Sequence, residues 1–217
     1  MDFLLQQTKN FLSTNEMTRF HLGCGVNFLK GWLNINYWSH LEQGRLYANP
    51  NDSDGCILLN HDLRLGLPTE DDSLDAVYHC HLLEHIPYKE GIVFLERIFQ
   101  AMKPGGIHRI VVPDFKAFIQ SYLSEDAFLL NKYKDHVLSK DADVFQTRCA
   151  ILMGMVHNHE HKCMYDWETL HWCLERVGFS RISRKMYQES DLPDIEEIEK
   201  YAPIRAMESL CVECYKE

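Results

Sequence analysis

Short apolar runs alternate with stretches of helical spacing along this chain, and the alternation constrains the fold more than any other feature of the sequence. Five runs have the length and composition of β-strands, at residues 19–23, 32–36, 56–60, 74–79 and 107–114. Residues 89–102 place apolar side chains at helical intervals and end in a Lys-Pro-Gly-Gly region, where proline and glycine prevent a helix from continuing. Strands joined by helical connections favour a parallel sheet covered on both faces.

The second half of the chain adds a long helical stretch and two late strands. Residues 115–165 are helical in pattern and rich in aromatic side chains, and residues 166–179 predict a further helix with Asp166 as its N-cap. Residues 180–187 and 208–216 are predicted as strands. Since no repeat or linker interrupts the pattern, we expect one domain over residues 1–217, with 115–165 as an insertion after the fifth strand.

Charge and apolar content disfavour several classes of protein. The formal net charge of −10 repels phosphate backbones, so nucleic acid is an unfavourable partner. No apolar run approaches the roughly 20 residues that span a bilayer, so we expect a cytoplasmic protein without a membrane partner. The eight cysteines stand singly among apolar residues, as reduced thiols do, and Cys211 and Cys214 should point to opposite faces of a strand.

A glycine turn follows the first predicted strand. Gly23 and Gly25 would let the backbone approach a ligand closely, because a side chain at either position would occupy the ligand's space. The third glycine of the dinucleotide fingerprint is missing, since position 28 is Phe28. The turn therefore disfavours a pyrophosphate-bearing cofactor and favours a ligand without phosphate.

Three stretches carry a more specific signal in their order and spacing. They are HLGCGVNFLKGWLNIN (21–36), HDLRLGLPTEDDSLDAVYHCHLLEHI (61–86) and MKPGGIHRIVVPD (102–114). As a set they resemble the class I S-adenosylmethionine-dependent methyltransferases, most closely a bacterial group of predicted methyltransferases with LGCG, LEHI and KPGG motifs. The resemblance implies a Rossmann-like α/β fold with helices on both faces and a helical insertion that covers the acceptor side. Its sheet would have seven mostly parallel strands, the last of them antiparallel.

The resemblance also implies S-adenosylmethionine as the cofactor and assigns residues to its methionine part. Gly23 and Gly25 would lie against that part, with backbone groups that meet its carboxylate and amine. His21 and Cys24 belong to the same motif and are included in the expected cofactor site.

Two further motifs would hold the rest of the cofactor. Asp62 matches the position that accepts a hydrogen bond from the adenine amino group, and the Leu63 backbone would help to recognise the ring. His79 and Cys80 would follow the fourth strand and line the pocket around the methyl donor.

Asn36 departs from the family pattern at the end of the second strand. The family usually has Asp or Glu there, whose carboxylate accepts hydrogen bonds from both ribose hydroxyls. Asn36 keeps one acceptor oxygen but loses the charge, so we expect cofactor binding weaker by about 1 kcal/mol. The alternative is a shifted register, in which Asn34 or Asn36 is only a polar group at a strand end.

Candidate catalytic residues lie in and beside the insertion. His159, His161 and Tyr165 end it and could face the methyl acceptor, although a solvated histidine-rich loop is an equally good interpretation. Asp114 directly follows the fifth strand, where it could act as a base or cap the next helix.

A second histidine cluster raises the question of a metal. His81, Glu84 and His85 have i, i+3, i+4 spacing, and with the HNHEHKC stretch (157–163) they could form a site of two histidines and one carboxylate. Small-RNA 2′-O-methyltransferases and ubiquinone-pathway O-methyltransferases bind metal through Glu-x-x-Glu-His, but here His81 replaces the first Glu. Because metal-free members share the Leu-Glu-His sequence, we expect no metal.

The predicted function is methyl transfer to a small-molecule acceptor, a sugar or secondary metabolite, at oxygen or nitrogen. Two alternatives stay open: cleavage or cyclisation of S-adenosylmethionine, and a catalytically silent partner protein. A homodimer is a possible assembly.

Overall fold

The computed structural model describes residues 8, 17–48, 55–200 and 202–217, and these contain one mixed sheet of eight strands. The strand order is β3-β4-β2-β1-β5-β6-β8-β7. The strands are β1 (Arg19–Leu22), β2 (Leu33–Asn36), β3 (Arg45–Ala48), β4 (Ile57–Asn60), β5 (Leu74–Cys80), β6 (Met102–Pro113), β7 (Ser180–Lys185) and β8 (Ser209–Tyr215). The helices are α2 (Tyr88–Ala101), α3 (Phe115–Leu123), α4 (Phe128–His136), α5 (Arg148–His157), α6 (Trp167–Val177), α7 (Ile195–Ile198) and α8 (Pro203–Glu208).

The sheet departs from the predicted seven strands by one edge strand. β4, β2, β1, β5 and β6 pair in parallel, and β8 runs antiparallel to β6 and β7, as expected for the last strand. The additional strand, β3, pairs antiparallel with β4 at the edge. Its four residues, Arg-Leu-Tyr-Ala, are all partly or fully exposed, so no apolar run marked them in the sequence.

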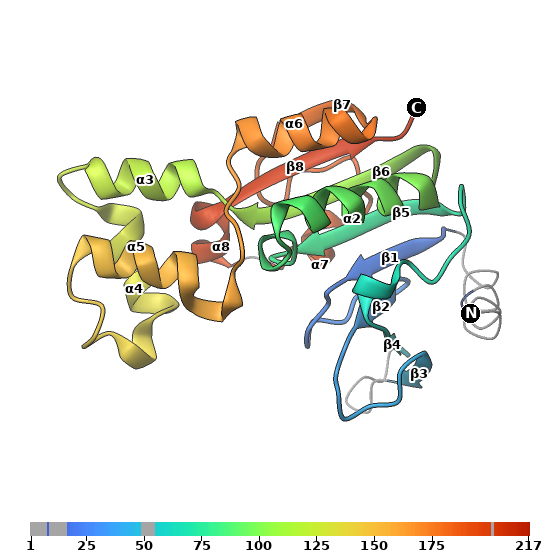
Figure 1. Cartoon of the computed structure of the whole chain (residues 1–217), viewed down its shortest axis with the longest axis horizontal. Helices are drawn as coiled ribbons and strands as arrows, with labels where there is room; N and C mark the ends of the chain where they lie inside the picture. Colours follow the sequence, from blue (N-terminus) through green and yellow to red (C-terminus); the bar gives the residue numbers. More distant parts are fainter. Residues whose placement is uncertain (1–7, 9–16, 49–54, 201) are drawn as a thin grey trace.

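The two faces of the sheet are covered differently (Figure 1). Helices α2 and α6 pack on one face, where side chains such as Leu95 and Leu174 join the main core. The other face is covered by Leu29 and Trp32 of the β1–β2 loop, together with Leu192 and α7. Helices on both faces are thus present, but a loop carries much of the second layer. Cys211 and Cys214 do lie on opposite faces, as predicted.

A loop without a helix joins β1 to β2 through the described residues 23–32, and one buried side chain holds it. The Asn34 amide oxygen accepts a hydrogen bond from the Leu29 amide at 2.8 Å and one from the His21 ring at 3.1 Å. Its amide nitrogen donates to the carbonyls of Leu29, Trp32 and Ile57 at 3.0 to 3.2 Å. These contacts satisfy backbone groups that a crossover helix would otherwise pair internally.

Asn60, the last residue of β4, likewise forms side-chain hydrogen bonds to the backbone of the segment after β2. Its side-chain oxygen accepts from the Trp38 amide at 2.7 Å, and its nitrogen donates to the carbonyls of Trp38, Leu41 and Glu42. Both Asn34 and Asn60 are fully buried. Two asparagines therefore shape the backbone around the carboxyl ends of β1, β2 and β4.

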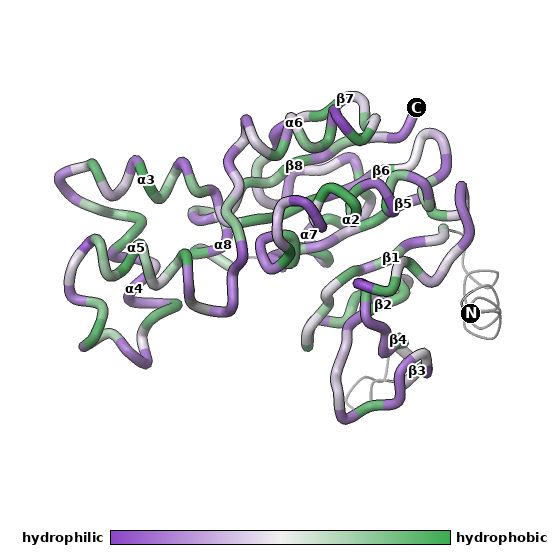
Figure 2. The backbone as a smooth tube through the Cα atoms, in the orientation of Figure 1, coloured by the Kyte–Doolittle hydropathy of each residue, from purple (hydrophilic) through white to green (hydrophobic). Residues whose placement is uncertain are grey.

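Helices α3, α4 and α5 form a helical lobe (residues 115–165) that projects beyond the carboxyl end of β6 (Figure 1). It has its own cluster of buried side chains, including Phe118, Leu130 and Met155, against which Met207 of α8 also packs. Hydrophobic and hydrophilic positions alternate along these helices in Figure 2, as expected for amphipathic helices that pack on one another. Among the described residues, no helix has the length and apolar character needed to cross a membrane.

Candidate active site

The carboxyl ends of four parallel strands converge around Gly23. Gly23 follows β1 directly, Asn36 is the last residue of β2, Asp62 comes two residues after β4, and Cys80 ends β5. Parallel strands bring these ends to the same edge of the sheet, which is where ligands bind in open α/β folds. The placement of Asn36 at the strand end agrees with the predicted register.

A first cavity of about 550 Å³ opens on the α2 side of Gly23. The strand ends contribute Asn36, Asp62 and Leu63 to its wall, and the turn after β5 contributes Leu82. The remaining wall comes from Tyr37, His61, Arg64, Ile86, Lys89, Glu90, Val93, Phe94 and Arg97. The charged side chains of α2 and Arg64 thus surround a mainly apolar floor.

A second cavity of about 630 Å³ lies on the other side of the same turn. The β1–β2 loop lines it from Gly23 to Leu29, and β5 contributes Tyr78 and Cys80. The opposite wall comes from the distant segment before β8, including Tyr187, Lys200 and Arg205. Gly23 lines both cavities, so the glycine turn separates a mainly apolar compartment from a more polar one.

The two glycines of the turn meet different requirements. A Cβ at Gly23 would come within 2.7 Å of Cδ1 of Leu82, so a side chain at that position would have to displace Leu82. A Cβ at Gly25 would meet nothing within 4 Å and would project into open space. Both residues have positive φ, 64° and 52°, which favours glycine.

Asn36 and Asp62 have partners within the protein. The Asn36 side-chain oxygen accepts a hydrogen bond from the Gly25 amide at 3.3 Å, which ties the glycine turn to β2. The Asp62 carboxylate accepts four hydrogen bonds from Arg64, one from the backbone amide and three from the guanidinium. The Arg64 hydrogen bond is the main cause that lowers the pKa of Asp62, so this carboxylate is charged at neutral pH.

The other predicted cofactor residues divide into two groups. His21, Cys24 and Cys80 line the second cavity, where burial raises the pKa of both thiols to about 12 and keeps them protonated. His79 does not line either cavity: it lies within β5, fully buried, with its ring against Phe94 and His108. The expectation that His79 and Cys80 follow the strand was wrong, because β5 continues to Cys80.

Asp114 and Tyr165 occupy structural positions. The Asp114 carboxylate caps α3 by accepting from the Ala117 amide at 3.2 Å and pairs with Arg184 at 2.6 Å. Tyr165 is 1% exposed, and its carbonyl accepts from the Phe115 amide at 3.0 Å. Of the alternatives that the sequence left open for Asp114, the geometry favours the cap.

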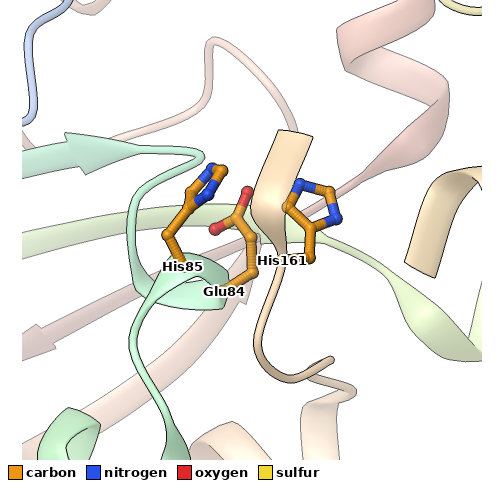
Figure 3. A group of neighbouring side chains, drawn as sticks. All are labelled: Glu84, His85 and His161. Carbon is orange, nitrogen blue, oxygen red and sulfur yellow. The ribbon is translucent and has the colours of Figure 1, made fainter. Parts of the chain in front are cut away.

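The turn after β5 and the end of the lobe meet although they are far apart in sequence. The Glu84 carbonyl accepts from the amides of Lys162 and Cys163 at 2.8 and 3.2 Å, and this contact docks the irregular segment that follows α5. As a result His161 lies beside Glu84 and His85, and the ring centroids of the two histidines are 4.8 Å apart (Figure 3). Exposed His159 has positive φ, 62°, and its ring centroid is 6.1 Å from that of His161.

Burial governs the charge of this histidine and carboxylate cluster. It lowers the pKa of His161 to about 4 and also lowers that of His85. Burial raises the pKa of the fully buried Glu84 carboxyl to about 8. The two imidazoles are therefore neutral near pH 7.

His81, which the sequence grouped with Glu84, has a different set of partners. Its Nδ1 accepts from the Arg205 guanidinium at 2.7 Å, since arginine can only donate, and Nε2 then donates to the Ser209 hydroxyl at 3.1 Å. Arg205 also pairs with Glu208 at 2.9 Å. His81 thus connects the turn after β5 to α8 and the second cavity.

Several residues of the site carried no signal in the sequence. Lys200 and Arg205 lie in a segment without a motif, and folding alone brings them to the second cavity. The α2 residues Val93, Phe94 and Arg97 read as an ordinary amphipathic helix. The sequence indicates only that α2 follows a strand after a short connection, which places the start of the helix near the edge of the sheet where the first cavity lies.

Comparison with known proteins identifies the domain that carries this site. Residues 31–183 match the sequence model of a methyltransferase domain, which covers more than half of the chain. The chain belongs to this methyltransferase family. A search of curated proteins gave no match to the methyltransferase.

Solved structures share the fold of the methyltransferase. An S-adenosylmethionine-dependent methyltransferase from Mesorhizobium loti is 17% identical, with a TM-score of 0.54, and the match covers 97% of this chain and 96% of that one. A possible histamine N-methyltransferase from Thermotoga maritima is 17% identical, with a TM-score of 0.52 and coverage of 99% and 87%. A complex of the Haloferax volcanii Trm112 activator with a methyltransferase matches at 14% identity and a TM-score of 0.51, with coverage of 100% and 91%.

Together these findings establish a Rossmann-like methyltransferase fold with an eight-stranded sheet. The family match and the neighbours named as S-adenosylmethionine-dependent methyltransferases support S-adenosylmethionine as the cofactor, which confirms that prediction.

Proposed function

We propose that this protein transfers a methyl group from S-adenosylmethionine to the oxygen or nitrogen of a small-molecule acceptor, such as a sugar or a secondary metabolite. The observation that carries the proposal is the pair of cavities that share Gly23 at the carboxyl ends of the parallel strands. A phosphate-free ligand that crosses the turn could occupy both. Single-domain organisation over residues 1–217, with the helical lobe on the acceptor side, is part of the same proposal.

The residues around the turn fit this cofactor. The first cavity offers Asn36 for a ribose hydroxyl, and Asp62 and Leu63 for the adenine edge, beside the apolar face of α2. The second cavity offers the backbone of the glycine loop and the cations Lys200 and Arg205 to the methionine carboxylate. Leu82, which fills the space over Gly23, would rotate to let the ligand cross.

When bound, the cofactor supplies an electrophilic methyl group on a sulfonium. The work of the chain is then mainly to position the acceptor in line and to exclude water. The helical lobe is placed to do this, since it adjoins the turn after β5 through the contact of Glu84 with Lys162. We propose His159 and His161, at the end of the lobe, as the histidines that face the acceptor.

Calorimetric titration with S-adenosylmethionine and S-adenosylhomocysteine tests the proposal. We expect micromolar binding of both by the native protein. Gly25→Asn should weaken binding at least about tenfold, because asparagine tolerates positive φ and its side chain would project into the open space beside the turn. Gly105→Asn is the matched control: Gly105 also has positive φ and open space around it, but it lies at the other end of the sheet.

Product analysis with a panel of small acceptors separates the alternatives. Methyl transfer leaves S-adenosylhomocysteine, whereas cyclisation leaves methylthioadenosine. Absence of binding to either cofactor form would contradict the proposal and favour a catalytically silent partner.

A further inference from the structure

The proposed function uses His161 but leaves the cluster that it forms with Glu84 and His85 unexplained. One ligand atom from each of the three side chains lies within 4.8 Å of the others. Figure 3 shows the Glu84 carboxylate between the two imidazole rings, with Glu84 and His85 on one turn and His161 on the segment after α5. Three potential ligands from two distant segments thus point to one place.

The Glu84 carboxylate is the observation that points to a ligand. Its side chain is fully buried, and among the described residues neither oxygen has a hydrogen-bond partner. Nδ1 of His81 lies 3.4 Å away, but it is already the acceptor for Arg205 and has no proton to donate. Buried polar side chains normally have hydrogen-bond partners or bind a cation, so a buried acidic group with neither oxygen paired is costly.

Contacts within the protein orient both histidine rings of the cluster. Nδ1 of His161 lies 2.7 Å from the Met155 carbonyl and donates to it, which leaves the Nε2 lone pair free. Metal-binding histidines are typically fixed by such a hydrogen bond to their other nitrogen. The His85 ring packs edge-on against the His161 ring, with ring centroids 4.8 Å apart.

The neighbouring charges allow a cation. The Arg205 guanidinium, which donates to the His81 ring at 2.7 Å, is balanced by Glu208 at 2.9 Å. Glu208 is thus paired with Arg205, whereas both oxygens of Glu84 are without a partner among the described residues and could bind an ion. Both histidine side chains are only partly buried, which leaves them room to close on an ion from their present spacing.

We propose that Glu84, His85 and His161 bind one divalent transition-metal ion. Two imidazoles and one carboxylate suit Zn²⁺, Fe²⁺, Co²⁺ or Mn²⁺, whereas Mg²⁺ prefers oxygen ligands throughout. Three protein ligands leave coordination positions open. Leu82 and Ile86, which flank the cluster in sequence, line the first cavity, so the ion would lie beside the proposed cofactor site. The consequence for catalysis rests on the proposed function: an acceptor with oxygen donor atoms would take the open positions.

Metal titration of the full-length protein tests the proposal without an acceptor. After chelator treatment and removal of the chelator, we expect one equivalent of Co²⁺ to bind, with visible absorption bands, and Zn²⁺ to displace it while excess Mg²⁺ does not. His161→Ala and Glu84→Gln should each weaken Co²⁺ binding at least about a hundredfold, because each removes a ligand. His136→Ala is the matched control, since His136 is an exposed histidine on α4 away from the cluster, and its affinity should match that of the native protein.

Two outcomes would overturn the metal site. One is absence of stoichiometric Co²⁺ binding by the native protein, and the other is equal binding by the native protein and both variants. Circular dichroism and thermal melting of each variant show whether it folds, and Glu84→Gln preserves the size of the side chain. Calorimetry with S-adenosylhomocysteine on the same samples is independent of the metal, so loss of cofactor binding, which would refute the proposed function, is distinguishable from loss of metal binding.

Discussion

The sheet has two halves: among the described residues, no α-helix connects β1, β2 and β4 in the first half, whereas α2, α6 and the helical lobe connect β5, β6, β7 and β8 in the second (Figure 1). In the first half, the buried amides of Asn34 and Asn60 satisfy the loop backbone. In the second half, apolar side chains such as Leu95 of α2 and Leu174 of α6 pack in the main core and hold the helices on the sheet. The backbone N–H and C=O groups between the strands of a parallel sheet need hydrogen-bond partners. A helix supplies these partners within its own backbone, and buried asparagine side chains can supply them instead.

The largest expected effect comes from removing an amide that holds a loop. Asn34→Ala leaves several buried backbone groups without partners, so the free energy of unfolding should fall by about 3 kcal/mol, as each such bond contributes roughly 1 kcal/mol. Urea unfolding measures this. Asn27→Ala, on an exposed position of the same loop, should change stability by less than about 0.5 kcal/mol. A loss below 1 kcal/mol for Asn34→Ala would show that something else holds the loop.

The helical half contains buried histidines that should make it sensitive to acid. His79 and His108 are fully buried in β5 and β6, with ring centroids 5.1 Å apart and no hydrogen-bond partner among the described residues. Burial lowers the pKa of His79 to about 3 and that of His108 well below its ordinary value. Both rings are neutral in the folded protein, whereas the unfolded chain takes up protons below about pH 6.5. Their contribution is intact above that pH and is lost as the pH falls toward the folded values.

Urea unfolding at pH 7.5 and pH 5.0 measures this acid sensitivity. Each buried histidine should account for about 2 kcal/mol of the stability lost at pH 5.0, since 1.5 pH units below 6.5 correspond to roughly that energy. His79→Leu should reduce the loss of stability between pH 7.5 and pH 5.0 by about 2 kcal/mol, because the variant has one buried histidine fewer. Exposed His136→Ala should leave the loss unchanged, and an equal loss in both variants would mean that the ring of His79 is not a source of acid sensitivity.

The smallest expected effect is on cofactor affinity at Asn36, which we assign to ligand binding, whereas Asn34 and Asn60 stabilise the fold. Asn36→Asp restores a charged acceptor at the end of β2, so affinity for S-adenosylhomocysteine should rise five- to tenfold, or about 1 kcal/mol. Stability should change little, because the Asn36 oxygen that accepts from Gly25 is retained. Asn60→Asp should instead destabilise the protein, because its side-chain nitrogen donates to three carbonyls. Unchanged or weaker binding by Asn36→Asp would contradict the ribose assignment.

Two histidines that are close together in the sequence, His79 and His85, show how little a local pattern says about the surroundings of a side chain. His79 lies only six residues before His85, yet one is enclosed by Phe94 and His108 and the other faces His161. Strand alternation could not separate them, because β5 is buried on both faces and ends one residue later than its pattern suggested. The hydrogen bonds of Lys162 and Cys163 to the Glu84 carbonyl place His161 beside His85, and they join positions more than 75 residues apart.

By itself the sequence determined the features that depend on neighbours along the chain: seven of the eight strands, the glycine turn, the end of α2 before Pro104, and the caps Asp114 and Asp166. The spacing of apolar residues, the conformation of glycine and helix capping each depend on a few neighbouring residues, so the sequence alone predicts them. The tertiary structure alone decided that polar β3 pairs at the sheet edge, that Lys200 and Arg205 reach the second cavity, and that Glu84 meets two histidines. Each of these depends on contacts between distant segments, whose partners no local pattern specifies.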